Sequence, residues 1–189
     1  MLFPIGSNSI VQVFSLKNKL WGRKKSSIIK PNGQQEGHRM RKNLKIDQEM
    51  KELWPAVRVG CLQYKVKVEK KNEEMWKYLK KDIFKKAKDD IFDYGINEIP
   101  NIKESRAAYK AFGKDPSRYR VSSEALIRRI GQGKGLYEVN TVVDVNNLIS
   151  IESGFSVGSY DTANIDDELV FRVAGKARPI KESARRRSI

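Results

Sequence analysis

Four polar residues with short side chains lie in an otherwise apolar part of the sequence. Asn140, Asp144 and Asn147 fall within VNTVVDVNNLI, and Asp161 follows the aromatic Tyr160. Polar groups in such surroundings are expected to be buried or half-buried, so they must find hydrogen-bonding partners. Clamping of neighbouring backbone groups by Asp144 and Asn147, and capping of a turn by Asp161, would provide them. The alternative is that these residues line a pocket and bind a ligand through the same atoms.

The sequence contains one cysteine, Cys61, and one histidine, His38. A single cysteine excludes an internal disulfide and is typical of a protein in the reducing cytoplasm. The same count excludes a zinc site built from these two residues, and neither lies in a motif that pairs a nucleophile with a base. We therefore expect no metal and no cofactor, and the sequence identifies no catalytic residue.

The net charge of +15 suggests a nucleic-acid partner, but this charge is unevenly spread. Residues 1–39 carry +6 and residues 177–189 carry +4, which leaves only +5 for residues 40–176. Arg128 and Arg129 are expected on the outward face of a helix. We expect five basic residues of this part of the sequence to contact RNA phosphates: Arg118, Arg120, Arg128, Arg129 and Lys134.

Hydrophobic periodicity predicts the elements that must position these residues. In chain order they are a helix at 46–54, a strand at 57–68, helices at 72–93, 102–113 and 122–131, and a strand at 168–175. Residues 143–154 fit a helix or a strand equally well. The stripe of Trp76, Leu79 and Ile83 on the longest helix is expected to be core, and the lysines opposite it a solvated surface. Helices and strands alternate irregularly, which indicates an α+β fold.

Three segments are expected along the chain. Residues 1–39 show no sustained period and are interpreted as a disordered basic extension, with Met40 as an alternative start of the protein. Residues 40–176 form the domain, and residues 177–189 a basic tail. No run of apolar residues is long enough to span a membrane.

The central stretch resembles the tRNA-binding and editing module (the third and fourth domains) of the phenylalanyl-tRNA synthetase beta subunit. It is more similar still to small free-standing relatives of that module. The resemblance covers Ser105–Gly175 and rests on four features in order. These are a helix like Ser123–Ile130, an N-x-V-V-D-V-x-N run at Asn140–Asn147, a glycine-to-Tyr-Asp turn at Gly154–Asp161, and a strand like Leu169–Ala174. It implies an α+β fold of the editing-module type.

The resemblance also implies a pocket that receives the terminal adenosine and amino acid of a charged tRNA. The positions that match its motifs are Asn140, Asp144, Asn146, Asn147, Gly158, Tyr160 and Asp161. Two of them depart from the synthetase pattern. Asn146 stands where the module usually has threonine, and Gly158 where it has histidine, although free-standing relatives share this glycine. These departures remove the grounds for assigning a deacylase directly.

The C-terminal residues also differ from the family pattern. Relatives continue after RVAGK with a glycine-rich stretch that carries a glutamate, whereas ARPIKESARRRSI follows here. We expect the later strands of the module to be missing and hypothesise a frameshift in the last 13 or so residues. An open reading frame without a GETYKGIG-like alternative would contradict this.

Three functions remain open from the sequence. The first is a tRNA-binding module that recognises aminoacyl acceptor ends. The second is a hydrolase that deacylates mischarged tRNA, in which an oriented water and the tRNA's own hydroxyl act without a side-chain base. The third is an inactive fragment or a small-ligand-binding protein. Nothing in the sequence would house the aminoacylation site of a complete synthetase.

Overall fold

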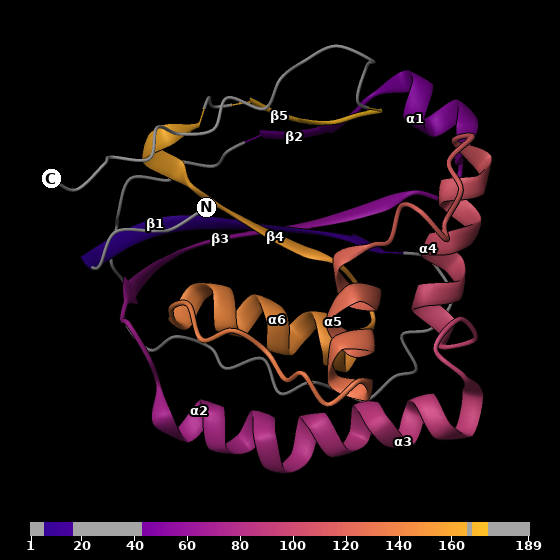
Figure 1. Ribbon diagram of the computed structural model, residues 1–189. Helices are drawn as coiled ribbons and strands as arrows, with labels where there is room; N and C mark the ends of the chain where they lie inside the picture. The colour runs from indigo at the N-terminus through magenta and orange to yellow at the C-terminus, as the bar shows by residue number, and fades with distance from the viewer. Residues whose placement is uncertain (1–5, 17–42, 166–167, 174–189) are drawn as a thin grey trace, which may run out of the picture.

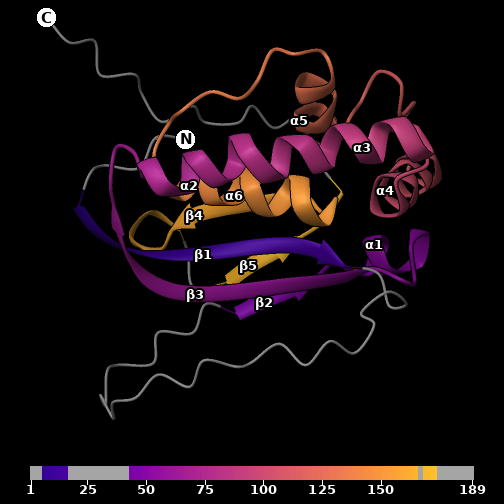
Figure 2. The same cartoon turned by 90° about the horizontal axis from the view of Figure 1, so that it is seen from below.

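A computed structural model describes residues 6–16, 43–165 and 168–173 of the chain, and side chains are described from residue 43 onward (Figure 1). A three-stranded sheet lies at the centre, with helices layered on one face and a two-stranded pair beyond the other (Figures 1 and 2). The strands are β1 (Gly6–Leu16), β2 (Asn43–Ile46), β3 (Arg58–Val68), β4 (Val157–Asp161) and β5 (Glu168–Phe171). The helices are α1 (Gln48–Leu53), α2 (Glu73–Tyr78), the π turn η1 (Leu79–Ile83), α3 (Phe84–Tyr94), α4 (Pro100–Ala111), α5 (Ser122–Gly131), α6 (Thr141–Ser153) and the 3-10 turn η2 (Thr162–Asn164).

The main sheet has the strand order β3-β1-β4, and both of its pairings are antiparallel. β1 pairs along its full length with β3, from Gly6 opposite Val68 to Leu16 opposite Arg58. The second pair, β2 and β5, is parallel. This mixture of helices with short, mainly antiparallel strands confirms the α+β fold.

The interpretation of residues 1–39 as a disordered extension was wrong for residues 6–16. These residues form β1, the middle strand of the sheet, and residues 17–42 lie outside the described ranges. The strand opens with Gly6, Ser7, Asn8 and Ser9, residue types that favour turns over strands. Pairing with β3 along the whole strand, and with β4 over residues 10–14, outweighs this weak local preference. Such pairing is a tertiary effect that periodicity does not reveal.

The long helix predicted at 72–93 is confirmed as α2, η1 and α3 in succession. Asn72 caps its start by accepting a hydrogen bond from the Met75 amide, and Gly95 ends it with a positive φ. Trp76, Leu79 and Ile83 of its apolar stripe are buried, as expected. They pack into the main core with the buried isoleucines of α4, α5 and α6: Ile102, Ile127, Ile130 and Ile151.

The ambiguous segment at 143–154 is helical and belongs to α6. The helix ends at Gly154, whose φ of 73° is the left-handed conformation typical of a glycine C-cap. The segment after it was expected to be a turn, but most of it is the edge strand β4, paired with β1. The strand expected at 168–175 is confirmed for Glu168–Phe171, which form β5. Residues 174 and 175 of the expected strand lie outside the described ranges.

Candidate functional site

Asn140 fixes the start of α6. Its side-chain oxygen accepts hydrogen bonds from the amides of Val142 and Val143, at 3.1 and 3.0 Å. The next residue, Thr141, links the helix to Glu69 at the end of β3. Its hydroxyl accepts a hydrogen bond from the Glu69 amide, and its own amide donates one to the Glu69 carbonyl. Asn140 is therefore buried as an N-cap, a role that satisfies backbone donors at the helix end.

Asp144 is fully buried and holds two elements together. One carboxylate oxygen accepts a hydrogen bond from the indole nitrogen of Trp76 at 2.8 Å, and the other accepts one from the amide of Val139 at 3.2 Å. Burial raises the pKa of this carboxyl, while the two hydrogen bonds act in the opposite direction. The contacts link the first turn of α6 to α2.

The remaining polar residues of the motifs connect α6 with β4 and the turn that follows. Asn146 accepts a hydrogen bond from the Ser159 hydroxyl at 2.8 Å, and Asn147 is half-buried on the same helix. Asp161 caps η2 by accepting hydrogen bonds from the Ala163 amide and the Asn164 side chain. The prediction that Asp161 caps a turn is confirmed.

A cavity of about 640 Å³ lies beside β4. Its walls come from α1, α4, the start of α5, the segment that enters β4, and β5. The lining residues are Met50, Trp54, Val57, Asn101, Glu104, Ser105, Ala108, Tyr109, Phe112, Lys114, Arg120, Val121, Ser122, Phe155, Ser156, Val157, Gly158, Tyr160, Phe171 and Val173. The volume falls within the range of small-molecule sites, about 300–1,000 Å³.

Two of the expected pocket residues, Gly158 and Tyr160, line this cavity. A Cβ built on Gly158 would meet the Tyr160 ring at 3.5–3.8 Å, which is ordinary contact, so the wall has room for a side chain there. The other five, Asn140, Asp144, Asn146, Asn147 and Asp161, do not line it. They form the contacts given above, and their part in binding a ligand stays a prediction.

The cavity is mostly apolar, with cationic groups on one wall. Aromatic rings of Tyr109, Phe112 and Phe155 provide flat apolar surface, while Lys114 and Arg120 contribute positive charge and Glu104 one negative charge. The start of α5 also lines the cavity, and its Ser123 amide donates a long hydrogen bond to the Ser156 hydroxyl at 3.4 Å. The amide dipoles at a helix N-terminus favour anions. The arrangement therefore suits a ligand with a flat or apolar body and an anionic group.

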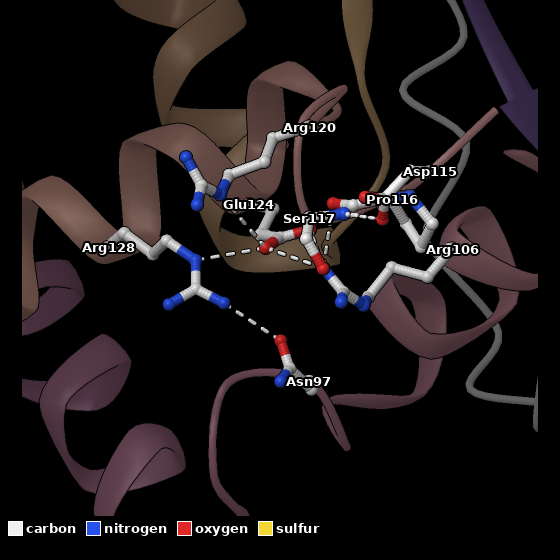
Figure 3. A network of polar contacts seen from close by, with 8 residues as sticks. All are labelled: Asn97, Arg106, Asp115, Pro116, Ser117, Arg120, Glu124 and Arg128. Carbon is white, nitrogen blue, oxygen red and sulfur yellow. Dashed lines mark hydrogen bonds and ion pairs between the residues drawn. The ribbon is translucent and has the colours of Figure 1, made fainter.

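Arg120 belongs to a cluster of three arginines around Glu124 (Figure 3). Glu124 is 0% exposed, and its carboxylate lies 3.0 Å from Nη1 of Arg106 and 2.9 Å from Nε of Arg128. Arg120 is more distant, at 3.8 Å, and its side chain is 48% exposed. Of the three arginines, Arg120 is the one that lines the cavity, and it contributes positive charge there because arginine remains protonated.

The expected outward orientation of Arg128 and Arg129 was wrong, since both are half-buried. A buried carboxylate requires paired charges, and Glu124 recruits Arg128 one turn away. Arg129 stacks on the ring of Tyr137, with its guanidinium carbon 4.1 Å from the ring centroid. Arg118 and Lys134 are exposed. The five basic residues thus do not form one patch, and their contacts with RNA stay a prediction.

Cys61 lies half-buried on β3, and burial raises the pKa of its thiol. A raised pKa disfavours the reactive thiolate. His38 lies outside the described residues. Within the described ranges, no group of three or more His, Cys, Asp or Glu side chains is arranged to hold a metal ion. None of the helices described there is long and apolar enough to cross a bilayer.

A family model of the B3/4 domain matches residues 104–187. This is the domain found in the beta subunit of phenylalanyl-tRNA synthetase. The B3/4 match takes in α4 from its fifth residue, α5, α6, β4 and β5, and it extends past residue 176, where we expected the domain to end. Comparisons with curated proteins and with solved structures gave no match.

Motif-based reasoning missed most residues of the cavity. Trp54, which follows α1, and Tyr109 of α4 both contribute to its wall, and no spacing in the sequence connects them. Periodicity predicted both helices, but not that their aromatic residues face a common space. The family match at residues 104–187 includes several residues of the wall, among them Tyr109, Arg120 and Phe155, and so indicated the segment but not the cavity.

Proposed function

We propose that the chain is a tRNA-binding module that receives the aminoacyl acceptor end of tRNA in the cavity beside β4. The observation that carries this proposal is the position of that cavity. Its walls are built largely from the segment that the B3/4 model matches, and this domain occurs in a tRNA-dependent enzyme.

The lining of the cavity supports the same proposal. Tyr109, Phe112 and Phe155 offer aromatic surface on which an adenine or an aromatic amino acid would stack. Arg120 and Lys114 supply positive charge for the phosphates next to the terminal nucleoside, against one negative charge from Glu104 in the lining. An apolar pocket with cationic groups on one wall is suited to a nucleotide that carries an amino acid.

Substitution of Arg120 by glutamine tests the role of this wall. We expect the variant to bind tRNA roughly tenfold more weakly and the salt dependence of its affinity to decrease, because a phosphate contact is lost. Filter binding at several salt concentrations measures both quantities. Since Arg120 is the outermost arginine of the cluster, the fold should be retained.

The matched control is Lys103→Gln. Lys103 is exposed on α4 and pairs with Glu98, and it does not line the cavity. It should leave tRNA binding nearly unchanged. Equal affinity of the wild-type protein for tRNA and for random RNA of the same length would contradict the proposed function.

A further inference from the structure

A row of lysines follows the exposed side of the long helix formed by α2, η1 and α3. Lys77, Lys81, Lys85 and Lys88 recur every three to four residues and are all exposed. Residues at this spacing lie along one side of a helix. None of the four belongs to an ion pair among the described residues, whereas Lys86 of the same helix pairs with Asp90.

A second segment lies alongside this helix. The glycine-rich loop that follows α5 runs beside α2 and α3 in both views (Figures 1 and 2). A Cβ built on Gly131, the last residue of α5, would lie 2.8 Å from Cδ1 of Ile91, so a larger residue there would require the end of that side chain to move. At Gly135 the loop lies against the ring of Phe84. The loop, with Lys134 and Tyr137, therefore lies next to the long helix, to which it is also joined by the ion pair of Glu138 with Lys80.

Two exposed aromatic rings accompany these lysines. Phe92, four residues beyond Lys88, is 90% exposed. Tyr137 is 70% exposed, and Arg129 stacks on it. A single exposed aromatic residue needs no explanation. Here, however, the apolar stripe of the helix is already buried in the core. Phe92 lies one turn beyond Lys88, with the exposed Asp89 and Asp93 also near it, and Tyr137 carries Arg129 on its face.

We infer that this surface binds a single-stranded segment of RNA. The surface is defined by Lys81, Lys85, Lys88, Phe92, Lys134 and Tyr137. Proteins that bind single strands combine cations that follow the phosphates with aromatic rings on which unpaired bases stack. A regular duplex offers no unstacked bases to such rings. A lipid surface would require a continuous apolar face, and the apolar face of this helix is in the core.

The surface is separate from the cavity proposed for the acceptor end. None of its six residues lines that cavity. It would therefore hold a second part of the same RNA, such as a loop, or a different strand. The inference depends on the lysine row and the rings, so it stands or fails independently of the acceptor-end proposal.

The test uses the full chain and a fluorescent, unstructured oligouridine of about twelve nucleotides, with fluorescence anisotropy as the readout. Combined substitution of Lys81, Lys85 and Lys88 by glutamine should weaken binding roughly tenfold or more. The slope of log K against log salt should fall by about two, since each phosphate contact on a single strand contributes about 0.7. Phe92→Ala should weaken binding about fivefold or more through lost stacking, and Phe92→Tyr should retain it.

A control variant replaces Lys45, Lys86 and Lys103 by glutamine. This variant lowers the net charge by the same three units as the first triple variant, but each of its lysines is already in an ion pair. It should bind the oligouridine much more tightly than the first triple variant does. Equal losses in the two triple variants, no binding by the wild-type protein, tighter binding to a duplex, or binding to anionic vesicles instead of RNA would each overturn the inference.

Discussion

Replacing Glu124 by alanine should lower the free energy of unfolding by about 3 kcal/mol, a large fraction of the stability of a small domain. The carboxylate is fully buried and receives both Arg106 and Arg128 at hydrogen-bonding distance. Without it, Arg106 keeps only the Pro116 carbonyl as a partner in its mostly buried position. Urea denaturation followed by circular dichroism measures the change.

Arg120→Ala is the matched control for this prediction. Its guanidinium lies farther from the same carboxylate and is about half exposed, so its removal should cost less than about 1 kcal/mol. Glu124→Ala with nearly wild-type stability, or the two variants with equal losses, would show that the cluster does not anchor α5 to α4.

Asp144→Ala should lower the free energy of unfolding by about 2–5 kcal/mol, because it leaves two buried donors without partners. These donors are the Trp76 indole and the Val139 amide. Trp76→Phe removes one of them and allows a double-mutant cycle. The double variant should lose less stability than the sum of the single variants, since the shared hydrogen bond is lost only once.

The effect of Asp144→Ala should also depend on pH. Burial raises the pKa of Asp144 in the folded protein, so the folded state binds this proton more tightly than the unfolded chain. The stabilising contribution is therefore complete below the unfolded pKa and decreases as pH rises through the folded pKa. The variant lacks this titration, so its loss relative to the wild-type protein should be greater near pH 4 than at pH 7. A loss that grows toward neutral pH would contradict the assigned direction.

The sequence predicted those elements whose local pattern agrees with their tertiary surroundings. The 3.6-residue stripe of Trp76, Leu79 and Ile83 specified the long helix because one face of it is core. The segment after Asn140 was ambiguous because apolar residues occur on nearly all sides of α6. The structure places the N-cap of this helix at Asn140, a local feature that the sequence analysis did not use.

The features that the sequence did not predict depend on contacts between distant segments. β1 is held by β3 and β4, which are separated from it by tens of residues. The ion pair of Glu124, in the first turn of α5, with Arg106 was not predicted, because Arg106 reaches it from α4. The cavity likewise combines side chains from α1 to β5. Motif matching found Gly158 and Tyr160 on its wall but gave no indication of the aromatic residues opposite.

The most direct test of the proposed acceptor-end site compares two acceptor-stem minihelices that differ only at the 3′ end. One carries the terminal adenosine with an amino acid in a stable amide linkage, and the other lacks that nucleoside. If the cavity receives this end, the complete minihelix should bind roughly tenfold more tightly, as expected for one stacked base. Equal affinity for the two minihelices would contradict the proposal.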